Sequence, residues 1–236
     1  MCMAVLQKIS TGCDKIDQFL GGGIAAGGVI LIYGEAETGK TTLAMQCAVN
    51  CARQGCKTLF VDCDNTFSVQ RLSQIASDKF REVAELIILM RPNDFREQGV
   101  VVDRLADWIT KNFGFVVFDT ITSLYRLNVG ESASKTFEMN RELNRQLAVL
   151  AQVARTQRVA VLVASQVHSV LNRVTVSVQP VATRVLKFWA DTVIALNPTE
   201  IPQIVRAVLE KNPRKGQAIA CDLKIEETGI HRYLMR

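Results

Sequence analysis

The feature that most constrains this chain is a glycine-rich segment between a predicted strand and a predicted helix. Residues 34–41, Gly-Glu-Ala-Glu-Thr-Gly-Lys-Thr, have the form GxxxxGK[ST]. They follow the apolar, β-branched run Val29–Tyr33 and precede residues 40–54, which favour a helix. A strand, loop and helix in this order form a phosphate-binding loop, whose backbone N–H groups turn inward toward an anion. The alternative is a glycine-rich turn with an exposed lysine, which does not require the flanking strand and helix.

Each residue type in this loop has a physical reason. Glycine permits the tight backbone curl, and the N-terminus of the following helix attracts negative charge. Lys40 supplies an ammonium to the β- and γ-phosphates, and the hydroxyl of Thr41 is a ligand for Mg²⁺. We therefore expect ATP and Mg²⁺ as cofactors. The expected nucleotide contacts in the loop are Gly34, Glu35, Ala36, Glu37, Thr38, Gly39, Lys40, Thr41 and Thr42.

Short apolar runs alternate with helical stretches along most of the chain. The runs predict buried strands at Val29–Tyr33, Lys57–Val61, Leu86–Met90, Phe115–Phe118 and Val159–Ala164. Helices are predicted over 40–54, 69–80 and 99–112, and along an apolar stripe from Met139 to Ala154. Further strands with short turns follow over 192–196, 204–210 and 217–225. The pattern predicts a single α/β domain over 1–236, with a mostly parallel sheet flanked by helices and extended by antiparallel strands near the C-terminus.

Composition excludes several classes of protein. Hydrophobic residues make up 48% and charged residues 22%, a balance typical of a folded globular chain rather than a disordered one. The longest uncharged stretch, residues 18–34, is glycine-rich and shorter than a bilayer span, and the N-terminus has no secretory signal pattern. We expect a cytoplasmic protein with no membrane partner. Its seven cysteines are then reduced and act as small apolar groups.

Acidic residues follow two of the predicted strands. A protein that hydrolyses ATP at a phosphate-binding loop needs a metal ligand and a group that polarises water at this edge of the sheet. Asp119 ends the run Phe-Val-Val-Phe-Asp and is the expected second ligand of Mg²⁺, beside Thr41. Asp62 and Asp64 close the second strand, and either is a candidate for the carboxylate that polarises the attacking water. The alternative is that they only cap the helix that follows.

Two segments, 126–134 and 168–184, fit no regular pattern. Both follow the carboxyl ends of parallel strands, where open α/β sheets bind ligands. Arg173 and Arg184 are candidates for phosphate contacts with DNA, and the alternating valines near them are typical of a small β-ribbon. An ordinary edge hairpin is the alternative. The net charge of +5, from 28 basic and 23 acidic residues, is compatible with DNA binding without requiring it.

Several stretches together resemble the RecA-like ATPase core of RecA-type recombinases, most closely that of the archaeal branch. They are Ser10-Thr-Gly12 with Asp14, Asp17, Leu20 and Gly21–Gly23, then the phosphate loop, residues 62–71, residues 119–126 and Ser165-Gln-Val167. The resemblance covers nearly the whole chain. Because the chain starts at this core, without the helical N-terminal domain of the full recombinase, it is most similar to the short archaeal paralogue.

The resemblance implies roles for individual positions in the nucleotide site. Lys40, Asp64 and Gln166 fall on catalytic positions. Asp64 stands where the family has its catalytic glutamate, and Gln166 falls on the glutamine that senses the γ-phosphate. Arg71 falls on the arginine that packs against adenine.

The resemblance also implies where DNA binds. Segments 126–134 and 168–184 fall on the family's two DNA-binding loops, which adds Arg126 to the two arginines of the second segment. The pair Glu210-Lys211 resembles a Glu-Lys pair in a terminal strand of the short paralogues.

The implied function is that of an accessory protein in recombination and DNA repair, which binds ATP and single-stranded DNA and assists the principal recombinase. Because Asp64 is one methylene shorter than glutamate, the implied activity is a weak, DNA-dependent ATPase. Expected partners are single-stranded DNA, the principal recombinase, and a second copy of the chain in a dimer or short oligomer. Two other functions remain open. One is a RecA-type ATPase that acts on a protein partner without a DNA role, and the other is an interaction module that binds nucleotide structurally.

Overall fold

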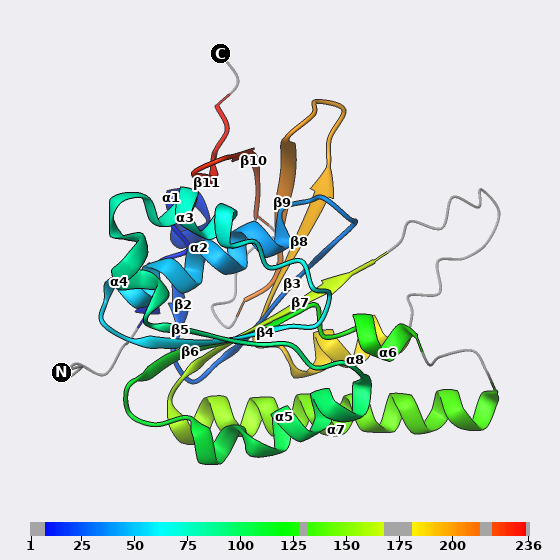
Figure 1. Ribbon diagram of the computed structural model, residues 1–236. Coiled ribbons are helices and arrows are strands. Elements are labelled where there is room, and N and C mark those ends of the chain that lie inside the picture. The colour runs from blue at the N-terminus through cyan, green and yellow to red at the C-terminus, as the bar shows by residue number, and fades with distance from the viewer. Residues whose placement is uncertain (1–7, 128–131, 168–180, 213–218, 235–236) are drawn as a thin grey trace.

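The computed structural model describes residues 8–127, 132–167, 181–212 and 219–234. Within these ranges the main sheet has nine strands in the order β11-β10-β9-β8-β3-β7-β6-β4-β5 (Figure 1). In that order the strands are Gly229–Arg232, Ile219–Glu226, Ile204–Lys211, Thr192–Pro198, Val29–Gly34, Ala160–Gln166, Phe113–Asp119, Lys57–Asp62 and Ile87–Met90. The strands from β8 to β5 are parallel, whereas β9, β10 and β11 extend the sheet in antiparallel fashion. The predicted fold class is confirmed.

Helices cover both faces of the sheet (Figure 1). One face carries α1, α2, α3 and α4, which span Asp14–Phe19, Lys40–Arg53, Val69–Ala76 and Phe80–Ala84. The other carries α5, α7 and α8, which span Phe95–Trp108, Ala133–Gln157 and Val181–Trp189. Side chains of β3 alternate between the two layers: Ile30 and Ile32 pack in the core beneath α2, and Val29 and Leu31 pack in the core beneath α7. Because both faces are buried, the central strands are continuous apolar runs.

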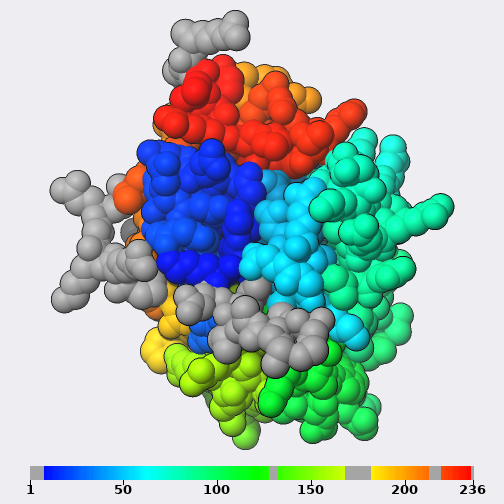
Figure 2. Space-filling model, turned by 90° about the vertical axis from the view of Figure 1, so that its left-hand side faces the viewer, coloured from blue at the N-terminus to red at the C-terminus, as the bar shows by residue number. Residues whose placement is uncertain are grey.

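Residues from the two ends of the described chain lie side by side. Near the N-terminus, β1 (Lys8–Ile9) pairs with β2 (Ile24–Ala25) in a small separate sheet. Figure 2 shows these residues, in blue, directly beside the C-terminal strands, in red. β11 packs against both α1 and α2. The sequence did not predict β1, β2, α1 or β11, because each is too short to show a periodicity.

The helix predicted over 69–80 is interrupted. α3 ends at Ala76, a 3-10 turn follows at η1 (Ser77–Lys79), and α4 begins at Phe80. Ser77 has φ of 56°, in the left-handed region, which ends the α-helical hydrogen-bond pattern. The prediction was wrong here because Ser-Asp-Lys fits the exposed face of a helix as well as a turn.

The segment 168–184 was predicted to be irregular throughout, and this was wrong for its end. α8 begins at Val181, so Arg184 is an exposed residue of a helix rather than of a loop. Arg173 lies outside the described residues. In the first irregular segment, Arg126 is the last residue of a short helix, α6 (Ser123–Arg126), and α7 begins at Ala133.

α7 follows the predicted apolar stripe. The side chain of Ser132 caps the helix by accepting a hydrogen bond from the backbone N–H of Lys135. The stripe residues buried against the sheet are Leu143, Leu147, Leu150 and Ala154, and Met139 is partly buried. Among the described residues, no helix combines the length and the apolar character needed to cross a bilayer.

Candidate nucleotide-binding site

The carboxyl ends of four parallel strands bring the predicted site residues to one edge of the sheet. Gly34 at the end of β3 is in register with Gln166 at the end of β7. Asp119 at the end of β6 is in register with Asp62 at the end of β4. Because β7 lies between β3 and β6, one strand separates the phosphate loop from Asp119.

The loop that follows β3 needs glycine at two positions for steric reasons. A Cβ at Gly34 would collide with the carbonyl oxygen of Leu196 and would lie 2.8 Å from Oγ1 of Thr38. Gly39 has φ of 86°, which favours glycine, and it directly precedes the first residue of α2. The first backbone N–H groups of α2 have no acceptor within the helix, and they form a positively polarised cradle for an anion.

Lys40 lies over this loop instead of pointing into solvent. Its Nζ donates hydrogen bonds to the carbonyl oxygen of Glu35 and, at 3.4 Å, to Oγ1 of Thr38. Thr38 Oγ1 donates in turn to the Glu35 carbonyl at 2.9 Å. Burial lowers the pKa of the Lys40 ammonium, and the negative charges of Asp119 and Asp64 oppose that effect. The side chain is therefore buried against the loop.

Asp119 is the strongest indication that this edge of the sheet can hold a cation. Its side chain is fully buried, and neither carboxylate oxygen has a hydrogen-bond partner in the part of the chain that the structure describes. Burial raises its pKa to about 6, the charge of Asp64 adds to the effect, and the neighbouring Thr41 hydroxyl partly offsets it. Buried carboxylates without a partner are costly unless they bind a cation. Asp119 and Thr41 supply oxygen ligands of the kind Mg²⁺ prefers, so the residues present fit this metal.

The structure separates the two acidic residues at the end of β4. Asp62 is buried and accepts hydrogen bonds from the backbone N–H groups of Thr66 and Phe67 and from Nε of Arg91, at 3.0 to 3.2 Å. Its lone pairs thus stabilise the turn before α3. Asp64 lies beyond the strand, and its Oδ2 accepts a 2.9 Å hydrogen bond from Oγ1 of Thr120. Of the two candidates, Asp64 is the one available to the nucleotide site.

Arg126 lies close to this site. Its guanidinium donates a 3.4 Å hydrogen bond to Oγ1 of Thr122, whose hydroxyl lies 3.1 Å from that of Ser165. Burial lowers the pKa of Arg126, and the charge of Asp64 opposes this. Arg126 also lowers the pKa of the Lys40 ammonium by charge repulsion. The residue predicted for DNA contact is therefore electrostatically linked to the nucleotide site.

A C-terminal hairpin borders the start of α2 and holds Arg71. Nη1 of Arg71, on α3, donates to the carbonyl oxygens of Glu226 and Glu227, at 3.0 and 3.3 Å. Gln46 of α2 fixes β11 through both backbone groups of Ile230: it accepts from the N–H at 2.7 Å and donates to the carbonyl oxygen at 3.2 Å. These contacts place Arg71 beside the hairpin, whose Ile225 and Ile230 side chains lie against Gly39 of the phosphate loop.

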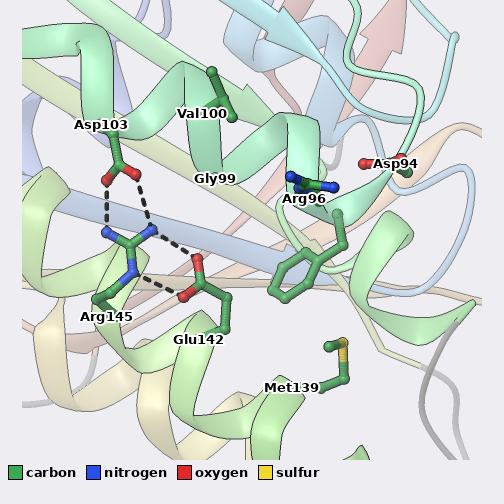
Figure 3. A pocket seen from close by; sticks show the side chains of 9 residues that line it. Asp94, Arg96, Gly99, Val100, Asp103, Met139, Glu142 and Arg145 are labelled. Carbon is green, nitrogen blue, oxygen red and sulfur yellow. Dashed lines mark hydrogen bonds and ion pairs between the residues drawn. The ribbon is translucent and has the colours of Figure 1, made fainter.

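A separate hollow of about 520 Å³ lies between α5 and α7 (Figure 3). Arg145 bridges it by binding Asp103 on α5 and Glu142 on α7. None of the predicted site residues lines this hollow.

Sequence reasoning missed the residues that orient the site. Thr120, which binds Asp64, and Arg91, which binds Asp62, have no motif of their own. Thr120 directly follows Asp119 and lies within residues 119–126, one of the stretches that carry the resemblance, but no role was predicted for it.

The phosphate loop follows the central strand β3, and the buried Asp119 ends β6, which lies two strands away from β3 in the sheet. This arrangement defines a RecA-like P-loop core. The family model described as Rad51 matches residues 3–231, and the chain belongs to the Rad51 family. It is 30% identical to the DNA repair and recombination protein RadB of Methanococcoides burtonii, over 96% of this chain and 98% of that protein. It is 36% identical to the RadB of Thermococcus gammatolerans, over 94% and 97% of the two chains. A crystal structure of the RadB recombinase matches it with a TM-score of 0.82 and 34% identity, over 96% of this chain and 100% of that one. The expected resemblance to RecA-type recombinases, and to the archaeal paralogue RadB, is confirmed.

Proposed function

We propose that this protein binds ATP with Mg²⁺ and acts as an accessory factor in DNA repair and recombination, which binds single-stranded DNA and assists the principal recombinase. The proposal draws its biological setting from the relatives, which carry the name DNA repair and recombination protein and match over nearly their full lengths. Its chemistry comes from the chain's own residues.

The observation that carries the proposal is the convergence of Lys40, Thr41 and Asp119 at one edge of the sheet. The Lys40 ammonium and the first turn of α2 offset the negative charge of a triphosphate. Thr41 and the buried, unpartnered Asp119 would hold Mg²⁺. When bound, the metal supplies charge neutralisation at the phosphate oxygens. Arg71, at the side of the loop, would contact the base.

We propose that ATP hydrolysis is weak because the side chain of Asp64 is too short to reach the attacking water well. A general base must come within hydrogen-bond distance of the proton that it removes. The shorter side chain of aspartate limits that reach, and the Oδ2 atom of Asp64 already accepts a hydrogen bond from Thr120. Gln166, at the end of β7, would contact the γ-phosphate as a sensor of the nucleotide state.

Arg126, Arg184 and Arg173 are the proposed DNA contacts, with the last outside the described residues. Because these are cationic contacts of the kind that bind phosphates, the binding should be sensitive to salt and tolerant of sequence. We further propose that the protein is cytoplasmic and associates with the recombinase and with itself as a dimer or short oligomer.

Turnover of ATP, measured with and without single-stranded DNA, tests this function. The wild-type protein should hydrolyse ATP slowly, and the Asp64→Glu variant should raise the DNA-stimulated rate about tenfold or more, since general bases contribute about 10²–10⁴-fold. Asp64→Asn is the matched control and should give no increase. Brisk turnover by the wild type, together with strand exchange without the recombinase, would overturn the accessory function. Retention of ATP without retention of single-stranded DNA would favour an ATPase that acts on a protein partner.

A further inference from the structure

Two consecutive residues of β3 contact the chain on both sides of the segment 168–180. On one side, the backbone N–H of Val167 donates to the carbonyl oxygen of Gly34 at 3.1 Å. On the other side, Nζ of Lys187 in α8 donates to the hydroxyl of Tyr33 at 3.0 Å. Gly34 is also the first residue of the phosphate loop. The end of β3 is therefore linked directly to α8 and to the exit of β7.

Tyr33, Lys187 and Glu210 form a closed triangle of polar contacts. The Tyr33 hydroxyl donates to Oε1 of Glu210 at 2.7 Å, and Lys187 forms an ion pair with Oε2 of the same carboxylate at 2.8 Å. The Lys187 ammonium also lies 4.6 Å from the centre of the Tyr33 ring, which adds a cation–π contact. The triangle joins β3, α8 and β9, elements that are far apart in the sequence.

A second contact from β9 fixes the end of α8. Nζ of Lys211 donates hydrogen bonds to the carbonyl oxygens of Lys187 and Ala190. A cation at the C-terminus of a helix satisfies free carbonyl groups and complements the helix dipole. Both members of the Glu210-Lys211 pair, which the resemblance had singled out, therefore hold α8.

The environment of the triangle makes it stronger than an ordinary surface ion pair. The side chains of Lys187 and Glu210 are 24% and 34% exposed, so water screens them only partly. Burial raises the pKa of the Tyr33 hydroxyl. Burial also disfavours the charged form of Lys187, but its contacts with Glu210 and Tyr33 outweigh this and raise its pKa. At neutral pH the tyrosine is neutral and the lysine charged, as the contacts require.

We propose that Tyr33, Lys187 and Glu210 are positioning residues that couple the phosphate loop to α8, so that ATP binding at the loop changes the stability of α8. This deepens the proposed function and rests on it, because ATP is the ligand. The coupling follows from connectivity: Tyr33 precedes the loop by one residue, and its hydroxyl and ring provide a polar contact between β3 and Lys187 of α8, beside the apolar packing of the two elements. α8 also exposes Arg184 one turn before Lys187, so a change in α8 reaches a proposed DNA contact.

Hydrogen exchange of the α8 backbone amides, with and without Mg²⁺-ATP, tests the coupling in the full-length chain. In the wild type, ATP should slow exchange in residues 181–189 by about fivefold or more, the lower range of coupling between sites. Tyr33→Phe keeps the ring and removes only the hydroxyl, and it should bring this ratio close to one while ATP affinity is retained. Glu210→Gln should have the same effect.

Tyr125→Phe is the matched control, because it removes a tyrosine hydroxyl that donates elsewhere, to Oδ1 of Asn140 at 2.6 Å. It should keep the wild-type ratio, whereas a purely structural role of Tyr33 would lower thermal stability and leave the ratio unchanged. ATP binding with no response of α8 in the wild type, or an unchanged response in Tyr33→Phe, overturns the coupling and leaves the proposed function standing. A response of α8 without any retention of single-stranded DNA supports the coupling and overturns the proposed function. Failure of the wild type to bind ATP overturns both.

Discussion

At the scale of single residues, the ionised carboxylate of Asp119 lowers the stability of the folded protein, because the side chain is buried. It is fully buried, and its pKa is raised from 3.8 to about 6, mainly by burial. A carboxyl whose pKa is raised by folding holds its proton more tightly in the folded state than in the unfolded chain. The free energy of unfolding therefore falls as the pH rises from about 4 to 6, and the loss remains above that range. A residue kept at such a cost is expected to have a function, here as a metal ligand.

Asp119→Asn should remove this pH dependence without changing the size of the side chain. Relative to the variant, the wild type should lose about 2–3 kcal/mol of unfolding free energy between pH 4 and pH 7, from 1.36 kcal/mol for each unit of pKa. Urea denaturation at the two pH values, without metal or nucleotide, measures the difference. Asp107→Asn changes an exposed aspartate of α5 and should show no such effect. A constant difference between Asp119→Asn and the wild type across this range would contradict a buried, ionisable Asp119.

At the scale of elements, the buried side chain of Gln46 ties the C-terminal hairpin to α2. Gln46 of α2 satisfies both backbone groups of Ile230 in β11. Gly12 and Gly229 leave room for it, because a Cβ at either position would collide with the Gln46 side chain. The position of the hairpin, and of Arg71 against it, thus depends on this amide.

Gln46→Ala should lower the free energy of unfolding by about 2–4 kcal/mol, because it leaves a buried N–H and a buried carbonyl without partners. It should also weaken ATP binding, since the hairpin carries the carbonyl groups that hold Arg71 and its Ile225 and Ile230 side chains pack against Gly39 of the phosphate loop. Chemical denaturation and calorimetric titration measure the two effects. Gln152→Ala, an exposed change on α7, is the control. Unchanged stability in Gln46→Ala would mean that the hairpin is anchored elsewhere.

Elements buried on both faces were predictable, and elements defined by tertiary contacts were not. β3, β4 and β6 appear as continuous apolar runs, because each lies inside the sheet, and the structure extends them by one to three residues. The phosphate loop was predictable because its residue types follow from the chemistry of an anion. The break at Ser77 and the start of α8 gave no local signal. The choice between Asp62 and Asp64 depended on Arg91 and Thr120, which lie far away in the sequence.

At the scale of the whole molecule, the sheet order places the nucleotide site and the proposed DNA contacts at one edge. β3, β7 and β8 are neighbours, so the phosphate loop lies next to the strands that precede and follow α8. Arg184 is exposed on α8. Arg126, the last residue of α6, lies near Asp64. Nucleotide and nucleic acid would therefore bind to adjacent parts of one surface.

Arg184→Ala should weaken single-stranded DNA binding equally for all sequences and lower the salt slope by about one, as the loss of one phosphate contact predicts. Fluorescence anisotropy across a range of salt concentrations measures both. Arg155→Ala, an exposed arginine on the distant end of α7, should leave the slope unchanged. Equal slopes for Arg184→Ala and the wild type would remove Arg184 from the DNA contacts.

The most direct test of the nucleotide site is calorimetric titration of ATP into the protein with and without Mg²⁺. We expect saturable one-to-one binding that requires Mg²⁺, and its loss in Lys40→Ala but not in Lys79→Ala, an exposed lysine outside the loop. ATP binding that is absent in the wild type, or unaffected by Lys40→Ala, would contradict the assignment of this edge of the sheet as a nucleotide site.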